Sequence, residues 1–166
     1  MMECTYCDWI TSKKNLLYED EHSVVLINPK PASAGHLLVL PRKHITIFEQ
    51  LPSDIGARLG IIANKMSMIQ FEALGAQGTN LVIQNGVGAG QTMPHLGIHL
   101  IPRKEGDGIN LSWKSRPLTE EQMAAVELGL REQLENAQPP QPQQPTHEQP
   151  KPPLPPSMLK YPERIP

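Results

Sequence analysis

The stretch that decides the fold is Gly90-Gln91-Thr92-Met93-Pro94-His95-Leu96-Gly97-Ile98-His99-Leu100-Ile101. From residue 95 onward, large apolar residues alternate with histidine or glycine, which is the pattern of a half-buried strand. Successive side chains on a strand point to opposite faces, so His95, Gly97 and His99 are predicted to share one face. We therefore expect a strand over 95–102 on which two histidines flank a glycine. In the plainest interpretation, both histidines are ordinary core or edge residues.

The elements around this strand follow from periodicity and from turn residues. Apolar runs at 23–28 and 36–40, separated by a turn rich in Pro, Ala, Ser and Gly, predict a hairpin. Helical spacing of apolar residues predicts a helix over 53–75, and 79–84 predicts another strand. A capping pattern opens a last helix over 119–134. Together these elements predict an α+β fold, with an antiparallel sheet and helices packed on one face.

Composition divides the chain into two parts. A chain of 166 residues is long enough for one domain with a real core, but 139–166 contains eleven of the 18 prolines. Such a composition cannot offset the entropy of folding, so we expect a folded domain over 1–137 and an extended proline-rich tail over 138–166. Within the tail, 151–156 is either a solvated linker or a ligand for a proline-recognition module.

Charge and hydropathy exclude several classes of partner. The formal net charge is −2 and no long basic run occurs, so we expect no nucleic-acid polymer as a partner. The apolar runs are too short to span a bilayer, and the first residues lack the layout of a signal peptide. We expect a cytoplasmic protein without membrane association.

The spacing Cys4-Thr5-Tyr6-Cys7 admits three interpretations: a redox pair, half of a zinc site, or two buried thiols. The redox interpretation lacks the expected context, because the pair does not follow a first strand. A zinc site needs two further ligands from elsewhere in the chain.

With a histidine at position 97, the stretch would read His-φ-His-φ-His-φ-φ, the signature of the histidine triad nucleotide hydrolases and transferases. The chain resembles that family with glycine in the place of its nucleophile. The segments 28–31 and 35–44 resemble the family's substrate-binding strand pair, and 85–92 resembles its phosphate loop. The Ala-Gly-Gln-Thr sequence in that loop is most similar to the dinucleoside-polyphosphate hydrolase branch.

The resemblance implies a homodimer whose sheet continues across two subunits. It also implies a structural zinc ion, because zinc-binding members use a Cys-x-x-Cys, a histidine at the end of the second strand and the first triad histidine. The matching residues are Cys4, Cys7, His44 and His95, a set that would close a tetrahedral site. Without a metal, the cysteines would be reduced buried thiols and His44 a surface residue.

In the family's mechanism, the middle histidine attacks the α-phosphorus of a nucleotide and forms a nucleotidyl-histidine. Gly97 cannot do this, and it is expected to leave a hole beside the phosphate site. The resemblance assigns catalytic positions to His36, Gln91, His95, Gly97 and His99. It assigns nucleotide contacts to Asn28 at the ribose, Ile27 and Leu38 at the base, and Asn85, Gly90, Gln91, Thr92 and His99 near the phosphates.

These positions predict a nucleotide-binding hydrolase or nucleotidyl transferase scaffold whose own activity is impaired. Because the residues around Gly97 match the family, we favour an engineered deletion of the nucleophile. The alternative is a natural pseudoenzyme that acts as a nucleotide sensor or as an adaptor through its tail. A third interpretation is a zinc-stabilised interaction module without a nucleotide site.

Overall fold

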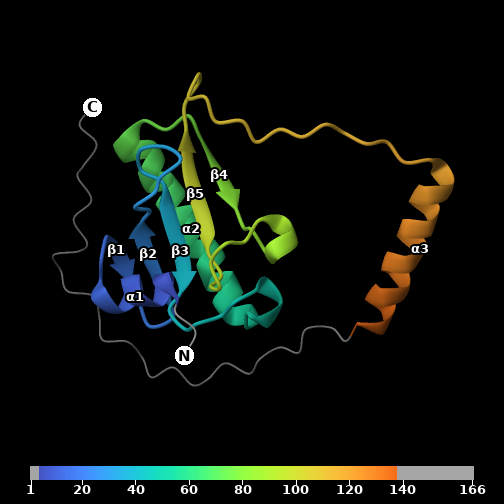
Figure 1. The fold of residues 1–166 in the computed structure, drawn as a ribbon, viewed down its shortest axis with the longest axis horizontal. Coiled ribbons are helices and arrows are strands. Elements are labelled where there is room, and N and C mark those ends of the chain that lie inside the picture. The colour runs from blue at the N-terminus through green and yellow to red at the C-terminus, as the bar shows by residue number, and fades with distance from the viewer. Residues whose placement is uncertain (1–3, 138–166) are drawn as a thin grey trace, which may run out of the picture.

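The computed structural model describes residues 4–137, which form three α-helices, two short 3₁₀ turns and five strands (Figure 1). The helices are α1 (Thr5–Ser12), α2 (Ser53–Leu74) and α3 (Glu120–Asn136), and the 3₁₀ turns are η1 (Phe48–Gln50) and η2 (Val87–Ala89). The strands are β1 (Leu16–Glu19), β2 (Ser23–Ile27), β3 (Leu37–Pro41), β4 (Gly78–Val82) and β5 (Ile98–Arg103).

The five strands form one antiparallel sheet in the order β1-β2-β3-β5-β4. β2 and β3 form the predicted hairpin, with Val25 opposite Val39. β5 lies between β3 and β4, so that His99 is opposite Leu38 on one side and Val82 on the other. The predicted α+β fold with an antiparallel sheet is confirmed.

Helix α2 covers one face of this sheet, where Leu59, Ala63 and Met66 pack against Val39 and Leu100. It begins and ends as predicted, with Gly75 in the left-handed conformation at its C-terminus. The spacing of its apolar residues places this buried stripe on a single side of the helix.

The expectation that the helices pack on one face holds for α2 alone. The sequence analysis did not predict α1, which covers the opposite face by packing Tyr6 and Ile10 against Leu26 and Leu38. Its eight residues are too few for a clear helical period. Helix α3 has the predicted capping box at Thr119, but it is exposed along its length and lies apart from the sheet (Figure 1).

Strand β5 begins at Ile98, three residues later than predicted. The pairing of β3 with β5 stops at Val39 and Ile98, and β4 ends at Val82 opposite His99, so residues 95–97 lie outside the sheet. Leu96 donates its N–H to the Ile45 carbonyl instead. The alternation of faces nevertheless persists. Ile98 packs toward α2, whereas His95, Gly97 and His99 line one pocket on the α1 face, as predicted.

No helix within residues 4–137 is both long enough and apolar enough to cross a bilayer. The proline-rich motif at 151–156 lies outside the described residues, and the predicted domain boundary at residue 137 stays a prediction.

Candidate functional site

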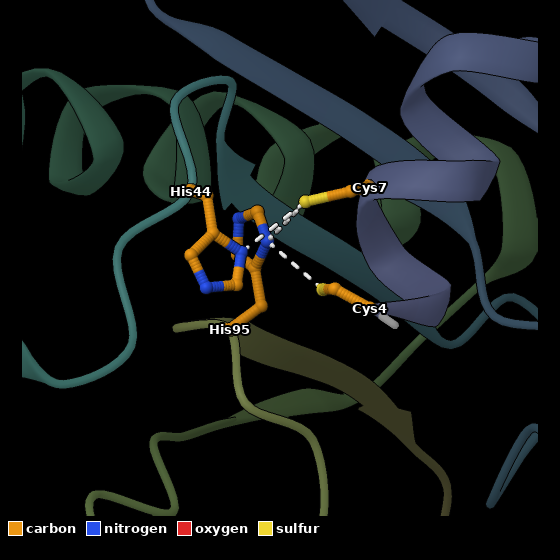
Figure 2. Close-up of side chains that lie close together, drawn as sticks. All are labelled: Cys4, Cys7, His44 and His95. Atoms are coloured by element: carbon orange, nitrogen blue, oxygen red, sulfur yellow. Dashed lines mark hydrogen bonds between the residues drawn. The ribbon is translucent and has the colours of Figure 1, made fainter. Parts of the chain in front are cut away.

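Four side chains from separate parts of the chain gather beside the N-terminus of α1 (Figure 2). Cys4 is the N-cap of this helix and Cys7 lies in its first turn. His44 comes from the loop after β3, and His95 from the segment before β5. One ligand atom from each lies within 4.8 Å of all the others. The structure thus brings together the four residues expected to bind zinc, which we call the metal cluster.

Each imidazole of the metal cluster directs its Nδ1 atom at a sulfur. Cys7 Sγ lies 3.2 Å from His44 Nδ1 and 3.5 Å from His95 Nδ1, and Cys4 Sγ also lies 3.5 Å from His95 Nδ1. The other ring nitrogen of His95, Nε2, lies 3.0 Å from the Pro41 carbonyl. Because a carbonyl only accepts, Nε2 carries the proton and Nδ1 keeps a lone pair. A metal-bound histidine is commonly held in this way.

The protonation of the metal cluster follows from its burial. Burial and the neighbouring Cys4 raise the pKa of the Cys7 thiol to about 11. Burial also lowers the pKa of His95, which keeps its imidazole neutral. A bound cation would favour the thiolate forms of the cysteines. Two thiolates and two neutral imidazoles are a donor set that suits Zn²⁺ in a closed structural site.

A second pair of histidines, His36 and His99, lies farther along the same face of the sheet. His36 is 4% exposed, and its Nε2 lies 3.1 Å from His99 Nδ1. The backbone N–H of Ala32 donates to His36 Nδ1 at 3.1 Å. Since Nδ1 accepts, the proton of neutral His36 is on Nε2 and is donated to His99 Nδ1. His99 must then carry its own proton on Nε2.

Both histidines of this pair are neutral near pH 7. Burial, together with the nearby His99, lowers the pKa of His36 to about 4, and burial lowers the pKa of His99. In this state, His99 offers an N–H donor at Nε2 rather than a lone pair. The pair is therefore arranged to donate a hydrogen bond to an anion, not to remove a proton from water.

A small pocket of about 40 Å³ opens on the α1 face, between the metal cluster and the histidine pair. This volume accommodates about three water-sized groups, which suits the oxygens of one phosphate but not a nucleobase. Its lining consists of Tyr6, Gln84, Gln91, Thr92, Met93, His95, Gly97 and His99.

Gly97 does not leave the vacant, ring-sized hole that the sequence led us to expect. A Cβ atom at this position would lie 2.9 Å from Leu40 Cδ2 and 3.5 Å from Tyr6 Cε2. The neighbouring side chains of β3 and α1 close over the glycine. The space that remains is the small pocket beside it.

Gln91, expected to donate to phosphate, instead braces its own loop. Its Oε1 accepts the Gly86 N–H at 2.7 Å, and its Nε2 donates to the carbonyls of Thr46 and Met93 at 2.8 Å each. Both of its amide hydrogens are therefore in use. Gln91 lines the pocket but holds the loop in shape.

The backbone of this loop also forms hydrogen bonds within the loop. Gly90, whose φ of +83° favours glycine, donates its N–H to the Val87 carbonyl at 3.0 Å. Asn85 accepts the Phe48 N–H at 2.8 Å and donates to the Glu49 carboxylate, which ties the loop to η1. Of the expected phosphate donors in this loop, Thr92 is the one that lines the pocket without being committed elsewhere.

The structure does not bring together the residues that were expected to form the base slot. Ile27 is opposite Leu37, whose side chain packs toward α2, so alternation places Ile27 on the face away from the pocket. Leu38 is on the correct face but is fully buried beneath α1. Asn28 lies near the His36 ring, with its Nδ2 at 3.4 Å from the imidazole nitrogens, and its Oδ1 accepts the Lys30 N–H.

Sequence reasoning missed Tyr6, Gln84 and Met93 in the pocket lining. One signal was available for Tyr6. If Cys4 and Cys7 share a metal with His95, the two residues between the cysteines, Thr5 and Tyr6, must lie near the segment that holds Gly97.

With this geometry described, comparisons with known proteins identify the family. Residues 11–106 match the model of the HIT domain. An uncharacterized HIT-like protein from Methanocaldococcus jannaschii is 37% identical over 107 residues, which cover 63% of this chain and 82% of that protein. The bis(5'-adenosyl)-triphosphatase of Dictyostelium discoideum is 33% identical over 99 residues, which cover 60% of this chain and 66% of that enzyme.

A solved structure extends the likeness to the fold. The crystal structure of a Zn-bound histidine triad family protein from Mycobacterium smegmatis superposes with a TM-score of 0.61 at 27% identity. The match covers 82% of this chain and 99% of that one. The sheet, the triad segment with its central glycine and the domain match together show that this chain belongs to the HIT family.

Proposed function

We propose that this chain binds the phosphate groups of adenine nucleotides, such as dinucleoside polyphosphates, in the pocket beside Gly97. The observation that carries the proposal is the His36–His99 pair, whose tautomers leave the Nε2–H of His99 as a donor at that pocket. The similarity to a bis(5'-adenosyl)-triphosphatase supports the choice of ligand.

Binding is not expected to lead to efficient hydrolysis. Glycine has no side chain that can attack phosphorus, and losing a covalent nucleophile costs about 10⁴-fold to 10⁶-fold in rate. His99 cannot replace it as a base, because its exposed ring nitrogen carries a proton when the ring is neutral. The scaffold is that of a nucleotide hydrolase or nucleotidyl transferase, and this chain is its impaired form.

Two origins of the glycine lead to different biological roles. An engineered deletion of the nucleophile would explain why the residues around position 97 still match those of the family. A natural nucleotide sensor or adaptor is favoured by the packing, because Leu40 and Tyr6 already close over the position. The codon for residue 97 in the unmodified gene distinguishes the two.

Calorimetric titration with ADP and with diadenosine triphosphate tests the proposal. We expect micromolar to millimolar affinity, because no Lys or Arg is among the residues that line the pocket. His99→Ala should weaken binding about tenfold or more, since a lost hydrogen bond of about 1.4 kcal/mol corresponds to that factor. His22→Ala, at an exposed histidine away from the pocket, is the control. An absence of binding by the unmodified chain at millimolar ligand would overturn the proposal in favour of a zinc-stabilised interaction module.

We also propose that the metal cluster holds one structural Zn²⁺ ion. The proposal is supported by the donor set, by the Nδ1 lone pair of His95 that faces both sulfurs and by the Zn-bound relative from Mycobacterium smegmatis. Such an ion would join α1 to the segment before β5, and it would leave no coordination position open for substrate.

A homodimer is proposed from an exposed apolar surface along the sheet edge. β4 is an edge strand, and its Leu81 is 55% exposed. Ile61, Met68 and Phe71 of the neighbouring α2 are also exposed. Pairing of two such edges would cover this surface. Leu81→Asp should shift the mass measured by light scattering from dimer to monomer, whereas Val87→Asp, at an exposed residue of η2, should not.

Two further proposals concern the whole chain. The 151–156 motif would dock into an aromatic-lined groove of a proline-recognition module, and a cytoplasmic location is proposed for the protein. Capture by an immobilised SH3 domain and cell fractionation are the respective tests.

A further inference from the structure

Tyr6 presents a buried phenol whose hydroxyl has no hydrogen-bond partner among residues 4–137. The residue is 7% exposed, yet its hydroxyl makes no hydrogen bond with any group in residues 4–137. A buried tyrosine hydroxyl usually has a partner. Among residues 4–137, two side-chain oxygens are both fully buried and without a hydrogen bond, those of Ser23 and Gln70. The hydroxyl of Tyr6 is not one of them, so this unpaired oxygen is not sealed in the core.

The surroundings of Tyr6 hold its ring at the pocket. The ring packs against Trp9 with centroids 5.4 Å apart, and it meets the His95 ring edge-on at 6.0 Å. It belongs to the first turn of α1, between the two cysteines of the metal cluster. Because Trp9 and His95 both pack against the Tyr6 ring, few alternative positions are open to it.

Tyr6 also lies beside the residue that is unusual in this family member. Its Cε2 atom is 3.5 Å from the position that a Cβ of residue 97 would take. Tyr6, Gly97, Thr92 and His99 line the same pocket. The phenol therefore stands next to the position from which a side chain at 97 would reach a phosphate.

We propose that the Tyr6 hydroxyl is a phosphate-binding donor that, with the Nε2–H of His99, holds a nucleotide phosphate beside Gly97. This inference deepens the proposed function and rests on it. A phenol keeps its proton at neutral pH, so it donates one hydrogen bond to a phosphate oxygen without adding charge. Two neutral donors on the same phosphate fit a pocket whose lining contains no Lys or Arg.

The test compares two variants of the full chain that each lose one hydroxyl. Tyr6→Phe removes the proposed donor and keeps the ring. Tyr18→Phe removes a hydroxyl that donates to Asp20 at 3.0 Å, on a residue that packs toward α2 on the other face of the sheet. ADP affinity is measured by calorimetry for each variant and for the unmodified chain. We expect Tyr6→Phe to bind ADP about tenfold more weakly and Tyr18→Phe to bind it unchanged.

A double variant examines whether the two donors act on one phosphate. If they do, the loss in Tyr6→Phe/His99→Ala should differ from the product of the two single losses, because groups that share a ligand are not additive. Zinc content and melting temperature are measured in parallel. A Tyr6→Phe variant that loses zinc or melts early enough to explain its weaker binding would give Tyr6 a structural role and overturn the proposal.

Failure of this inference can be separated from failure of the proposed function. If the unmodified chain binds ADP and His99→Ala weakens it, but Tyr6→Phe binds within twofold of the unmodified chain, the assignment of Tyr6 is wrong and the proposed function stands. If the unmodified chain does not bind ADP at millimolar concentration, both are wrong.

Discussion

Restoring a histidine at position 97 is the most informative perturbation of this site. A Cβ there would lie 2.9 Å from Leu40 Cδ2, which is a terminal methyl that can rotate away. The imidazole must then share the pocket with the Tyr6 ring. Overpacking of this kind costs about 1–3 kcal/mol, and removing a glycine from an extended segment returns about 0.5–1 kcal/mol. We expect a net loss of about 0–2.5 kcal/mol, or a melting temperature lower by up to about 10 °C.

The gain in chemistry should greatly exceed this loss in stability. A neutral imidazole is a good nucleophile near pH 7, and its absence costs about 10⁴-fold or more in rate. Gly97→His should therefore release AMP from diadenosine triphosphate at least about 10⁴-fold faster than the unmodified chain. Anion-exchange chromatography measures the AMP. Mass spectrometry of protein denatured and digested at alkaline pH, where the P–N bond is stable, should detect a nucleotidyl adduct on a peptide that contains residue 97.

Gly97→Asn is the matched control, because it adds a planar polar side chain without a nucleophile. It should share the fall in melting temperature and show no hydrolysis. The reasoning is refuted if Gly97→His is folded, binds ADP and still hydrolyses neither dinucleoside polyphosphates nor nucleoside phosphoramidates. That outcome would favour a natural nucleotide sensor.

Three further predictions follow from the metal cluster, the histidine pair and the loop. Metal analysis should give about one zinc per chain. Cys4→Ser should reduce both the zinc content and the melting temperature, whereas the control His22→Ala should change neither. A metal-free unmodified chain would contradict this prediction. Because the pKa of folded His36 is about 4 and its ordinary value is 6.5, the unfolded chain takes up this proton first as pH falls. The free energy of unfolding should therefore decrease between about pH 6.5 and 4, and it should decrease by less in His36→Asn. Thermal melts at a series of pH values measure this dependence. An equal pH dependence of stability in the two proteins would argue against the prediction. Gln91→Ala should lower the free energy of unfolding in urea by about 1–3 kcal/mol, because it leaves a Gly86 N–H without its partner, whereas Gln84→Ala should be neutral.

The sequence predicted the elements whose patterns are long and periodic. Helix α2 and the β2–β3 hairpin lie where apolar spacing and turn residues placed them. Helix α1 was missed because eight residues give little periodicity, and its position depends on contacts with the sheet. The start of β5 was misplaced because alternation continues through residues 95–97, whereas the pairing with β3 stops at Ile98 and the pairing with β4 stops at His99.

For the site, motif spacing predicted which residues gather but not what their polar atoms bind. The four residues of the metal cluster came together as expected. His36 and His99, each expected at the phosphates, proved to be hydrogen-bonded to each other. The side-chain amide of Gln91 forms hydrogen bonds with backbone groups around its own loop, because an amide can bind backbone groups as well as a ligand. Ile27 and Leu38 were assigned together to the base slot by resemblance, whereas strand alternation places them on opposite faces of the sheet.

The metal cluster also bears on the order in which the chain folds. Cys4 and His95 are 91 positions apart in the sequence but have ligand atoms 3.5 Å apart. Closing a loop of that length costs about 4–5 kcal/mol of chain entropy, whereas the β2–β3 hairpin closes over a short turn. Local pairing is therefore expected first, and Cys4 is expected to meet His95 only after β1 to β4 and α2 have been ordered between them. Until that late step both thiols are unprotected, so refolding in a reducing buffer should recover more native protein than refolding in air.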